Sequence, residues 1–201
     1  MFNECKRGVN NLNKALRTLL NYYLEVERYP EDFIKALKKA IPREVETVEL
    51  FVPTEEQIIE TLRKLKSAPH KYITLYWFVL ATGVRKEHAI DILNNFDIKR
   101  VVRIRTFYEY AANIMGATKA AWLALFPDFV LDLIREFLES GDKLHRVAVT
   151  TYARRHQLLP VKYIRKFAYN AMLSAGIPES VADFLHGRAR RTVGAKHYMD
   201  M

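Results

Sequence analysis

Apolar side chains recur every three to four positions along most of this 201-residue chain, a spacing that places them on one face of an α-helix. No other feature of the sequence constrains the fold as strongly. Pro30 interrupts the first such stretch, and Thr54 with Gln57 forms a capping box at the start of another. The pattern predicts helices at residues 11–40, broken at Pro30, and at 54–67, 71–81, 86–94, 129–139, 147–156, 161–175 and 178–186.

Two short segments depart from the helical spacing. Residues 101–107 alternate between apolar and polar side chains, as a half-buried strand does, and residues 118–126 are small and apolar. We expect two strands joined by a connection that contains Gly116, with Pro127 ending the second strand. The predicted fold class is therefore mainly α with a small β-hairpin or sheet, an α+β arrangement.

Composition excludes several classes of protein. Half of the residues are hydrophobic and the chain has only seven Gly and seven Pro, which indicates a globular protein and not a disordered one. The single cysteine, Cys5, cannot form an internal disulfide, and no Cys and His spacing suggests a zinc site, so we expect neither a metal nor another cofactor. No apolar run is long enough to span a membrane and no signal peptide is evident, so we expect a cytoplasmic protein without membrane contact.

Positive charge is concentrated near the end of the sequence. The whole chain has 32 Lys and Arg against 23 Asp and Glu, which gives a net charge of +9. Residues 143–201 contain eleven of the basic residues and three of the acidic ones, which accounts for nearly all of the excess. Such a block suits a surface that binds a polyanion such as DNA, but it is equally compatible with a solvated face that only keeps the protein in solution.

Three segments, in a fixed order, contain residue types suited to phosphodiester chemistry. They are Ala-Thr-Gly-Val-Arg at 81–85, Lys-Tyr-Ile-Arg at 162–165, and Leu-His-Gly-Arg at 185–188, which His-Tyr at 197–198 follows. A guanidinium can donate to two phosphate oxygens at once, so Arg85 and Arg165 suit the stabilisation of charge on the nonbridging oxygens. A phenol is a poor nucleophile at neutral pH unless nearby cations lower its pKa, and the basic C-terminal segment supplies cations near Tyr198 in sequence.

In this order the segments resemble the tyrosine recombinases, the site-specific integrases that break and rejoin DNA through a covalent 3′-phosphotyrosine. The likeness covers residues 54–201 and is greatest to integrases of archaeal viruses and plasmids. It implies a metal-independent DNA strand transferase that integrates or excises a mobile element, acts on a double-stranded DNA attachment site and assembles as a tetramer on paired sites. It also implies a partial helical core-binding region with a linker at residues 1–48, and a catalytic domain at 49–201.

The resemblance assigns six catalytic positions: Arg85, Lys119, Lys162, Arg165, Arg188 and Tyr198. Arg85 corresponds to the first catalytic arginine of the family. Lys162 and Arg165 correspond to its His/Lys-x-x-Arg box. Arg188 stands where the family usually has His or Trp.

The two remaining positions are the nucleophile, Tyr198, and the hairpin lysine that protonates the leaving 5′ oxygen, Lys119. The assignment of Lys119 depends on the register of the expected hairpin, so Arg103 or Arg105 could face the DNA in its place. The family usually has a complete helical core-binding domain before the catalytic domain and a helix after the tyrosine, and this sequence departs from both patterns. Tyr198 could enter its own site or that of a neighbouring subunit.

Five further cations are expected to contact DNA: Arg154, Arg155, Lys166, Arg190 and Arg191. Each has an ordinary interpretation as part of a solvated basic face, and Arg85 has one as a surface ion pair with Glu87 or Asp91. His186 and His197 flank the catalytic positions and could assist. Two other functions stay open: a topoisomerase of type IB, which shares the chemistry, and a catalytically silent DNA-binding fragment.

Overall fold

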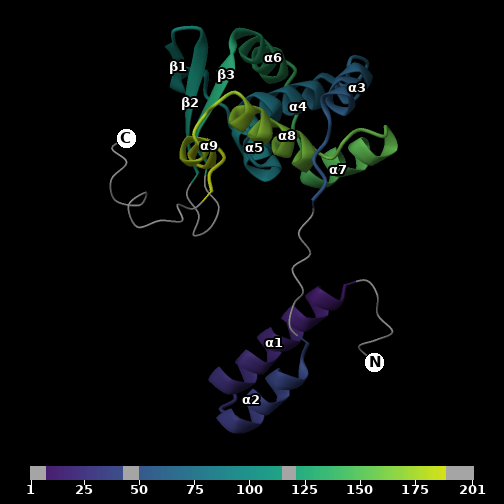
Figure 1. Ribbon diagram of the computed structural model, residues 1–201, viewed down its shortest axis with the longest axis vertical. Helices are drawn as coiled ribbons and strands as arrows, with labels where there is room; N and C mark the ends of the chain where they lie inside the picture. Colours follow the sequence, from purple (N-terminus) through teal and green to yellow (C-terminus); the bar gives the residue numbers. More distant parts are fainter. Residues whose placement is uncertain (1–7, 43–49, 115–120, 189–201) are drawn as a thin grey trace. The chain divides into compact units, whose positions relative to one another are not determined.

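The computed structural model describes residues 8–42, 50–114 and 121–188 (Figure 1). The chain divides into two compact units, Met1–Leu50 and Phe51–Met201. Four of the residues assigned above, Lys119, Arg190, Arg191 and Tyr198, lie outside the described residues, as do Gly116 and the start of the second expected strand.

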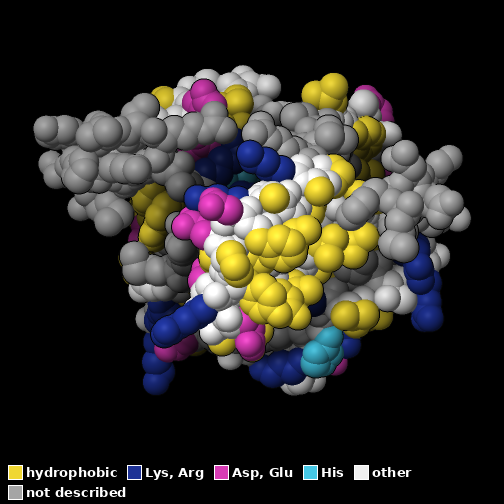
Figure 2. Space-filling view, turned by 90° about the horizontal axis from the view of Figure 1, so that it is seen from below, with side chains coloured by type: hydrophobic (Ala, Val, Ile, Leu, Met, Phe, Trp, Pro, Cys, Tyr) yellow, Lys and Arg dark blue, Asp and Glu magenta, His cyan; other side chains and the backbone are white. Residues whose placement is uncertain are grey.

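The first unit is a pair of helices, α1 (Val9–Glu25) and α2 (Glu31–Ala40), separated at Pro30 as predicted. The side chain of Asn13 donates to the carbonyl of Pro42, and that of Arg17 donates to the carbonyl of Ile41, so α1 holds the end of α2. Among the described residues of this unit, few side chains are buried, and large apolar ones such as Phe33 remain exposed. Figure 2 shows hydrophobic side chains gathered on the face of these helices that is turned to the viewer.

The second unit contains the remaining helices and a small sheet. Thr54 caps the first of them: its hydroxyl accepts from the Gln57 backbone while the Gln57 side chain accepts from the Thr54 backbone, which confirms the predicted capping box. The helices are α3 (Glu55–Leu65), α4 (His70–Thr82), α5 (Lys86–Asn94), α6 (Asp128–Glu139), α7 (Arg146–Arg155), α8 (Val161–Ser174) and α9 (Glu179–Leu185). No described helix is long and apolar enough to cross a membrane.

Helix α4 forms the centre of the second unit. It is apolar around its whole circumference, and side chains such as Leu75, Phe78 and Val79 are completely buried. It packs against α6, α8 and the third strand of the sheet (Figure 1), and the Tyr76 hydroxyl donates to the Leu159 carbonyl just before α8. This packing fixes the end of α4 relative to α8, and that end carries one part of the site described below.

The sheet has three antiparallel strands in the order β1-β2-β3: β1 (Val101–Ile104), β2 (Phe107–Ile114) and β3 (Ala121–Pro127). The prediction of one strand over 101–107 was wrong, because Ile104 pairs with Phe107 across a two-residue turn in which Arg105 has a positive φ of 52°. The segment that follows this turn, β2, is the central strand. The expectation of a mainly helical chain with a small sheet is confirmed.

Candidate active site

Two arginines that are far apart in the sequence share one backbone carbonyl, that of His186, and each donates to a further carbonyl beside it. The Arg165 Nε donates to the Gly83 oxygen at 2.7 Å, and its Nη2 donates to the His186 oxygen at 2.7 Å. The Arg85 Nη1 donates to the Gly187 oxygen at 2.8 Å and lies 3.4 Å from the His186 oxygen. The His186 carbonyl therefore touches both guanidinium groups and joins them into one cluster.

The ends of two helices supply these carbonyls. Helix α4 ends at Thr82, and Gly83, with a positive φ of 66°, turns the chain so that Arg85 becomes the residue directly before α5. Helix α9 ends at Leu185, and Gly187, with a φ of 59°, turns the chain there. Carbonyl groups at the C-terminus of a helix carry partial negative charge and favour cations, so both turns suit arginine side chains.

The two guanidiniums repel each other in a partly buried setting. Burial, and then the charges of Arg85 and Arg188, together lower the pKa of Arg165 to about 10. Burial, and then the charge of Arg188, also lower the pKa of Arg85. Both side chains remain charged at neutral pH. A cluster of like charges of this kind is unfavourable in the free protein and is stabilised by a bound anion.

Arg188 completes the cluster from the outside. Its side chain is exposed, its Nη1 pairs with the Asp183 carboxylate at 3.0 Å, and its guanidinium lies over the Tyr169 ring at 3.9 Å. The Tyr169 hydroxyl donates to the same carboxylate at 2.9 Å. These contacts hold Arg188 in place. Its charge lowers the pKa values of both Arg85 and Arg165.

A cleft of about 700 Å³ opens beside the arginine cluster, between α7, α8 and the start of α5. Arg85 and Arg165 line it, together with two exposed cations assigned from the sequence, Lys162 on α8 and Arg154 on α7. Its remaining lining is largely apolar, with side chains such as Val149, Ala153, Leu158 and Val161. The structure therefore brings together four of the residues predicted for catalysis or DNA contact.

The other assigned cations in the described part of the chain lie elsewhere. Arg155 is exposed at the end of α7 and is not part of the cleft lining. Lys166 on α8 donates to the Phe51 carbonyl at 2.5 Å, so it holds the segment that leads into α3. Arg105 lies in the turn between β1 and β2, and Arg103 is exposed on β1.

The acidic residues that offered an ordinary role for Arg85 have other partners. The Asp91 carboxylate pairs with Arg146 at 3.1 Å, and the Glu87 carboxylate pairs with Lys86 at 3.4 Å. Arg85 donates to backbone carbonyls, and the charge of Glu87 partly offsets the lowering of its pKa. Within the described ranges, no group of three or more His, Cys, Asp or Glu side chains is arranged to hold a metal ion.

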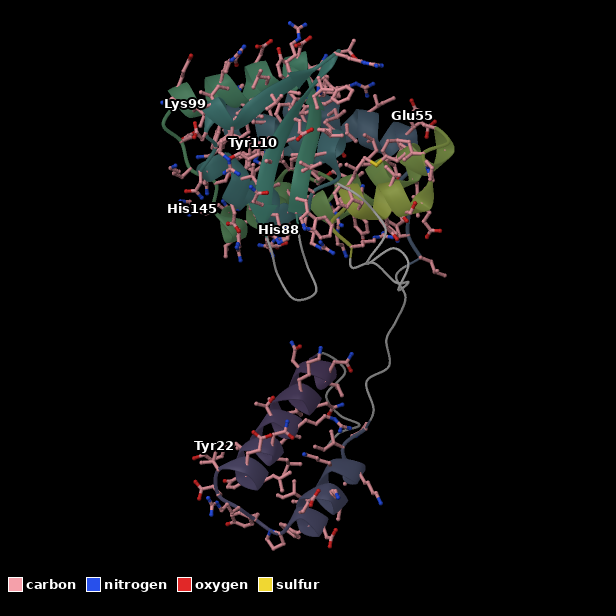
Figure 3. The ribbon with its side chains drawn as sticks, turned by 90° about the vertical axis from the view of Figure 1, so that its left-hand side faces the viewer. Tyr22, Glu55, His88, Lys99, Tyr110 and His145 are labelled. Carbon is pink, nitrogen blue, oxygen red and sulfur yellow. The ribbon has the colours of Figure 1, made fainter. Side chains whose placement is uncertain are left out.

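Two histidines belong to the surroundings of the cluster. His186 is 2% exposed, and burial together with Arg165 and Arg188 lowers its pKa to about 3. His88, which Figure 3 labels, lies on α5 and is half-buried. Burial, and then the charge of Arg85, lower its pKa. Sequence reasoning gave His88 no role, although it follows Arg85 by only three positions.

The group of helices around α4, with a small antiparallel sheet at one side, has the fold of a tyrosine recombinase catalytic domain. A crystal structure of the XerH site-specific recombinase bound to difH substrate, in a pre-cleavage complex, matches 90% of this chain at 16% sequence identity with a TM-score of 0.56. The match covers 58% of the XerH chain, so the present chain spans little more than half of that protein.

The sequence itself identifies the family. Residues 50–201 match the family model of the archaeal phage integrases, and the chain therefore belongs to this family. A search of curated protein sequences found no match.

Proposed function

We propose that this protein is a site-specific DNA recombinase that cleaves and rejoins DNA strands through a covalent 3′-phosphotyrosine at Tyr198. The observation that supports this most is the convergence of Arg85 and Arg165 on the carbonyls of Gly83, His186 and Gly187, at the edge of a cleft that Lys162 also lines. Membership of the archaeal phage integrase family supports the same conclusion.

The arginine pair suits the binding of a scissile phosphate. Arginine has five N–H groups, and two of those of Arg165 donate to the carbonyls, which fixes the plane of the guanidinium. Its other N–H groups can donate to the nonbridging oxygens, whose negative charge increases in the transition state. Because the carbonyls hold the side chain before DNA arrives, little reorganisation is needed when the charge develops.

The reaction conserves the number of phosphate ester bonds. The Tyr198 hydroxyl loses its proton to solvent as its oxygen attacks phosphorus, and the bond from phosphorus to the 5′ oxygen breaks. The 5′ oxygen takes up a proton from Lys119, which solvent then reprotonates. Attack by a 5′ hydroxyl on the phosphotyrosine reverses these steps and joins the strand to its old or a new partner. In this scheme Lys162 and Arg188 contribute further positive charge at the phosphate, and the tetramer on paired attachment sites provides the second duplex.

A nicked suicide DNA substrate tests the proposal. Cleavage releases a short fragment that carries the new 5′ hydroxyl, and its loss traps the covalent intermediate because no hydroxyl remains to attack the phosphotyrosine. The protein is expected to form an adduct that survives denaturing electrophoresis, with chelator present throughout. Tyr198→Phe should abolish the adduct, and the matched control Tyr29→Phe, which removes the hydroxyl of an exposed tyrosine in the first unit, should retain it.

Two results would redirect the assignment. DNA binding without any adduct on cognate DNA would contradict the proposal and favour a catalytically silent DNA-binding module. An adduct that accompanies relaxation of supercoiled plasmid, equally fast with and without an attachment site, would instead indicate a topoisomerase of type IB.

A further inference from the structure

The His186 side chain occupies the space between the two turns that hold the arginines. Its ring is 2% exposed and packs edge-on against the Tyr169 ring, with the centroids 5.0 Å apart. On its other side the ring packs against the backbone of Gly83. A Cβ atom added at Gly83 would stand 2.1 Å from the His186 Nε2, with Cε1 at 2.6 Å and Cδ2 at 2.7 Å.

The residues on either side of this contact are the ones whose carbonyls accept from Arg165. The Gly83 oxygen accepts from its Nε and the His186 oxygen from its Nη2, each at 2.7 Å. Any change in the separation of the two backbone segments moves one acceptor relative to the other. The imidazole lies where it can set that separation.

We propose that His186 is a positioning residue, whose ring spaces the Gly83 turn from the α9 turn and thereby fixes the orientation of the Arg165 guanidinium. The contact acts through shape, since the Nε2 atom has no hydrogen-bond partner among the described residues. The low pKa of His186 agrees with this role, because an uncharged ring can lie beside three arginines without adding to their repulsion. The importance of this spacing for catalysis rests on the function proposed above.

Two substitutions, one on each side of the contact, test the spacing role. Each alone should slow cleavage, and adding the first to the second should restore part of the rate. His186→Ala removes the spacer, and we expect single-turnover cleavage of the suicide substrate to slow by about 10-fold or more, with DNA affinity changed by less than about 3-fold, because a small misplacement of a catalytic group is costly to rate. Gly83→Ala should also slow cleavage, since its Cβ meets the ring and its φ is +66°. The double variant should cleave faster than Gly83→Ala alone, because the ring that its Cβ meets is gone.

Gly141→Ala is a matched control for Gly83→Ala. Gly141 has the same φ of +66°, but a Cβ there would meet nothing within 4 Å. Its substitution therefore introduces the backbone strain without the steric contact, and it should leave cleavage close to that of the parent protein. If Gly83→Ala cleaved as fast as Gly141→Ala, or if the double variant were slower than Gly83→Ala, the spacing role would be contradicted.

A measurement without DNA separates this proposal from the proposed function. The Arg165 Nε–H, held by the Gly83 carbonyl, should exchange slowly with solvent in ¹⁵N NMR, with the signal assigned by its loss in Arg165→Lys. His186→Ala should accelerate that exchange while the melting temperature shows that the protein is folded. Unchanged exchange would refute the positioning role. Absence of a covalent adduct in the parent protein, with accelerated exchange in the variant, would refute only the recombinase assignment.

Discussion

Two groups of cations in the second unit differ in what surrounds them. Arg85 and Arg165 are half-buried and donate to backbone carbonyls at the ends of α4 and α9. Arg154 and Arg155 are exposed in the last turn of α7, and Lys162 is exposed in the first turn of α8. Burying like charges together costs free energy. We infer that Arg85 and Arg165 are buried because their function requires guanidinium groups held in fixed positions. The outer group can serve a polyanion through charge alone.

The largest effect is expected from removing the inner guanidinium. Arg165→Ala should reduce the cleavage rate by about 10³-fold, the scale observed when a preorganised transition-state donor is lost, with a much smaller effect on DNA affinity. Arg165→Lys should recover little of the loss, because an ammonium cannot donate to two carbonyls and a phosphate in the same plane. Cleavage at saturating DNA, with Arg155→Ala as the control, measures this.

Equal losses of cleavage in Arg165→Ala and Arg155→Ala would mean that the two groups of cations do not differ in function. Melting temperatures of both variants show whether a loss of cleavage is caused by unfolding. The comparison then concerns folded protein only.

A pH-dependent loss of stability is expected from the inner region. The pKa of His186 is about 3 in the folded protein and about 6.5 in the unfolded chain, so the unfolded chain binds the proton first as pH falls. The free energy of unfolding should therefore decrease below about pH 6.5, by up to about 1.4 kcal/mol per pH unit for this group. The lowered pKa of His88 adds a loss of the same sign.

Urea unfolding at about pH 7 and about pH 5 measures this dependence through tryptophan fluorescence, and both tryptophans, Trp77 and Trp122, lie in the second unit. In His186→Leu the dependence should be flatter, with the contribution of His88 remaining. An identical slope in the parent and the variant would show that His186 is not held uncharged by its surroundings.

The smallest effect is expected from the outer cations. Arg155→Ala should weaken DNA binding by a few-fold at moderate salt and should reduce the slope of log affinity against log salt by about 0.9, the value for one phosphate contact. Cleavage at saturating DNA should not change. Binding titrations at several salt concentrations test this, and an unchanged slope would remove Arg155 from the DNA contact surface.

The helices were the most predictable part of the fold. The capping box at Thr54 and Gln57 and the proline at Pro30 mark helix starts through local chemistry that tertiary packing does not override. The sheet was less predictable. Its first turn contains Arg105 and Thr106 and lacks the Gly, Asn or Asp that usually marks a hairpin, so residues 101–107 have the pattern of a single strand.

The site was predictable in its residue types and not in its means of support. Arg85 and Arg165 could be assigned from sequence motifs, and the structure brings them together. Their ligands are backbone carbonyls, which every residue has, so no pattern of side chains could identify them. The spacing role proposed for His186 depends on a contact with Gly83, 103 positions away in the sequence. The contact forms because α4 and α9 both pack against α8, and the sequence alone does not reveal that packing.

The position of the covalent bond to DNA tests the central claim most directly. Protein trapped on a suicide substrate can be digested with nuclease and protease, and the peptide that carries a nucleotide can be sequenced by mass spectrometry. We predict one modified peptide, with the nucleotide on the Tyr198 oxygen, in the parent protein and in Arg155→Ala. A nucleotide on another tyrosine, such as Tyr163 beside Lys162, or no modified peptide on cognate DNA, would contradict the account.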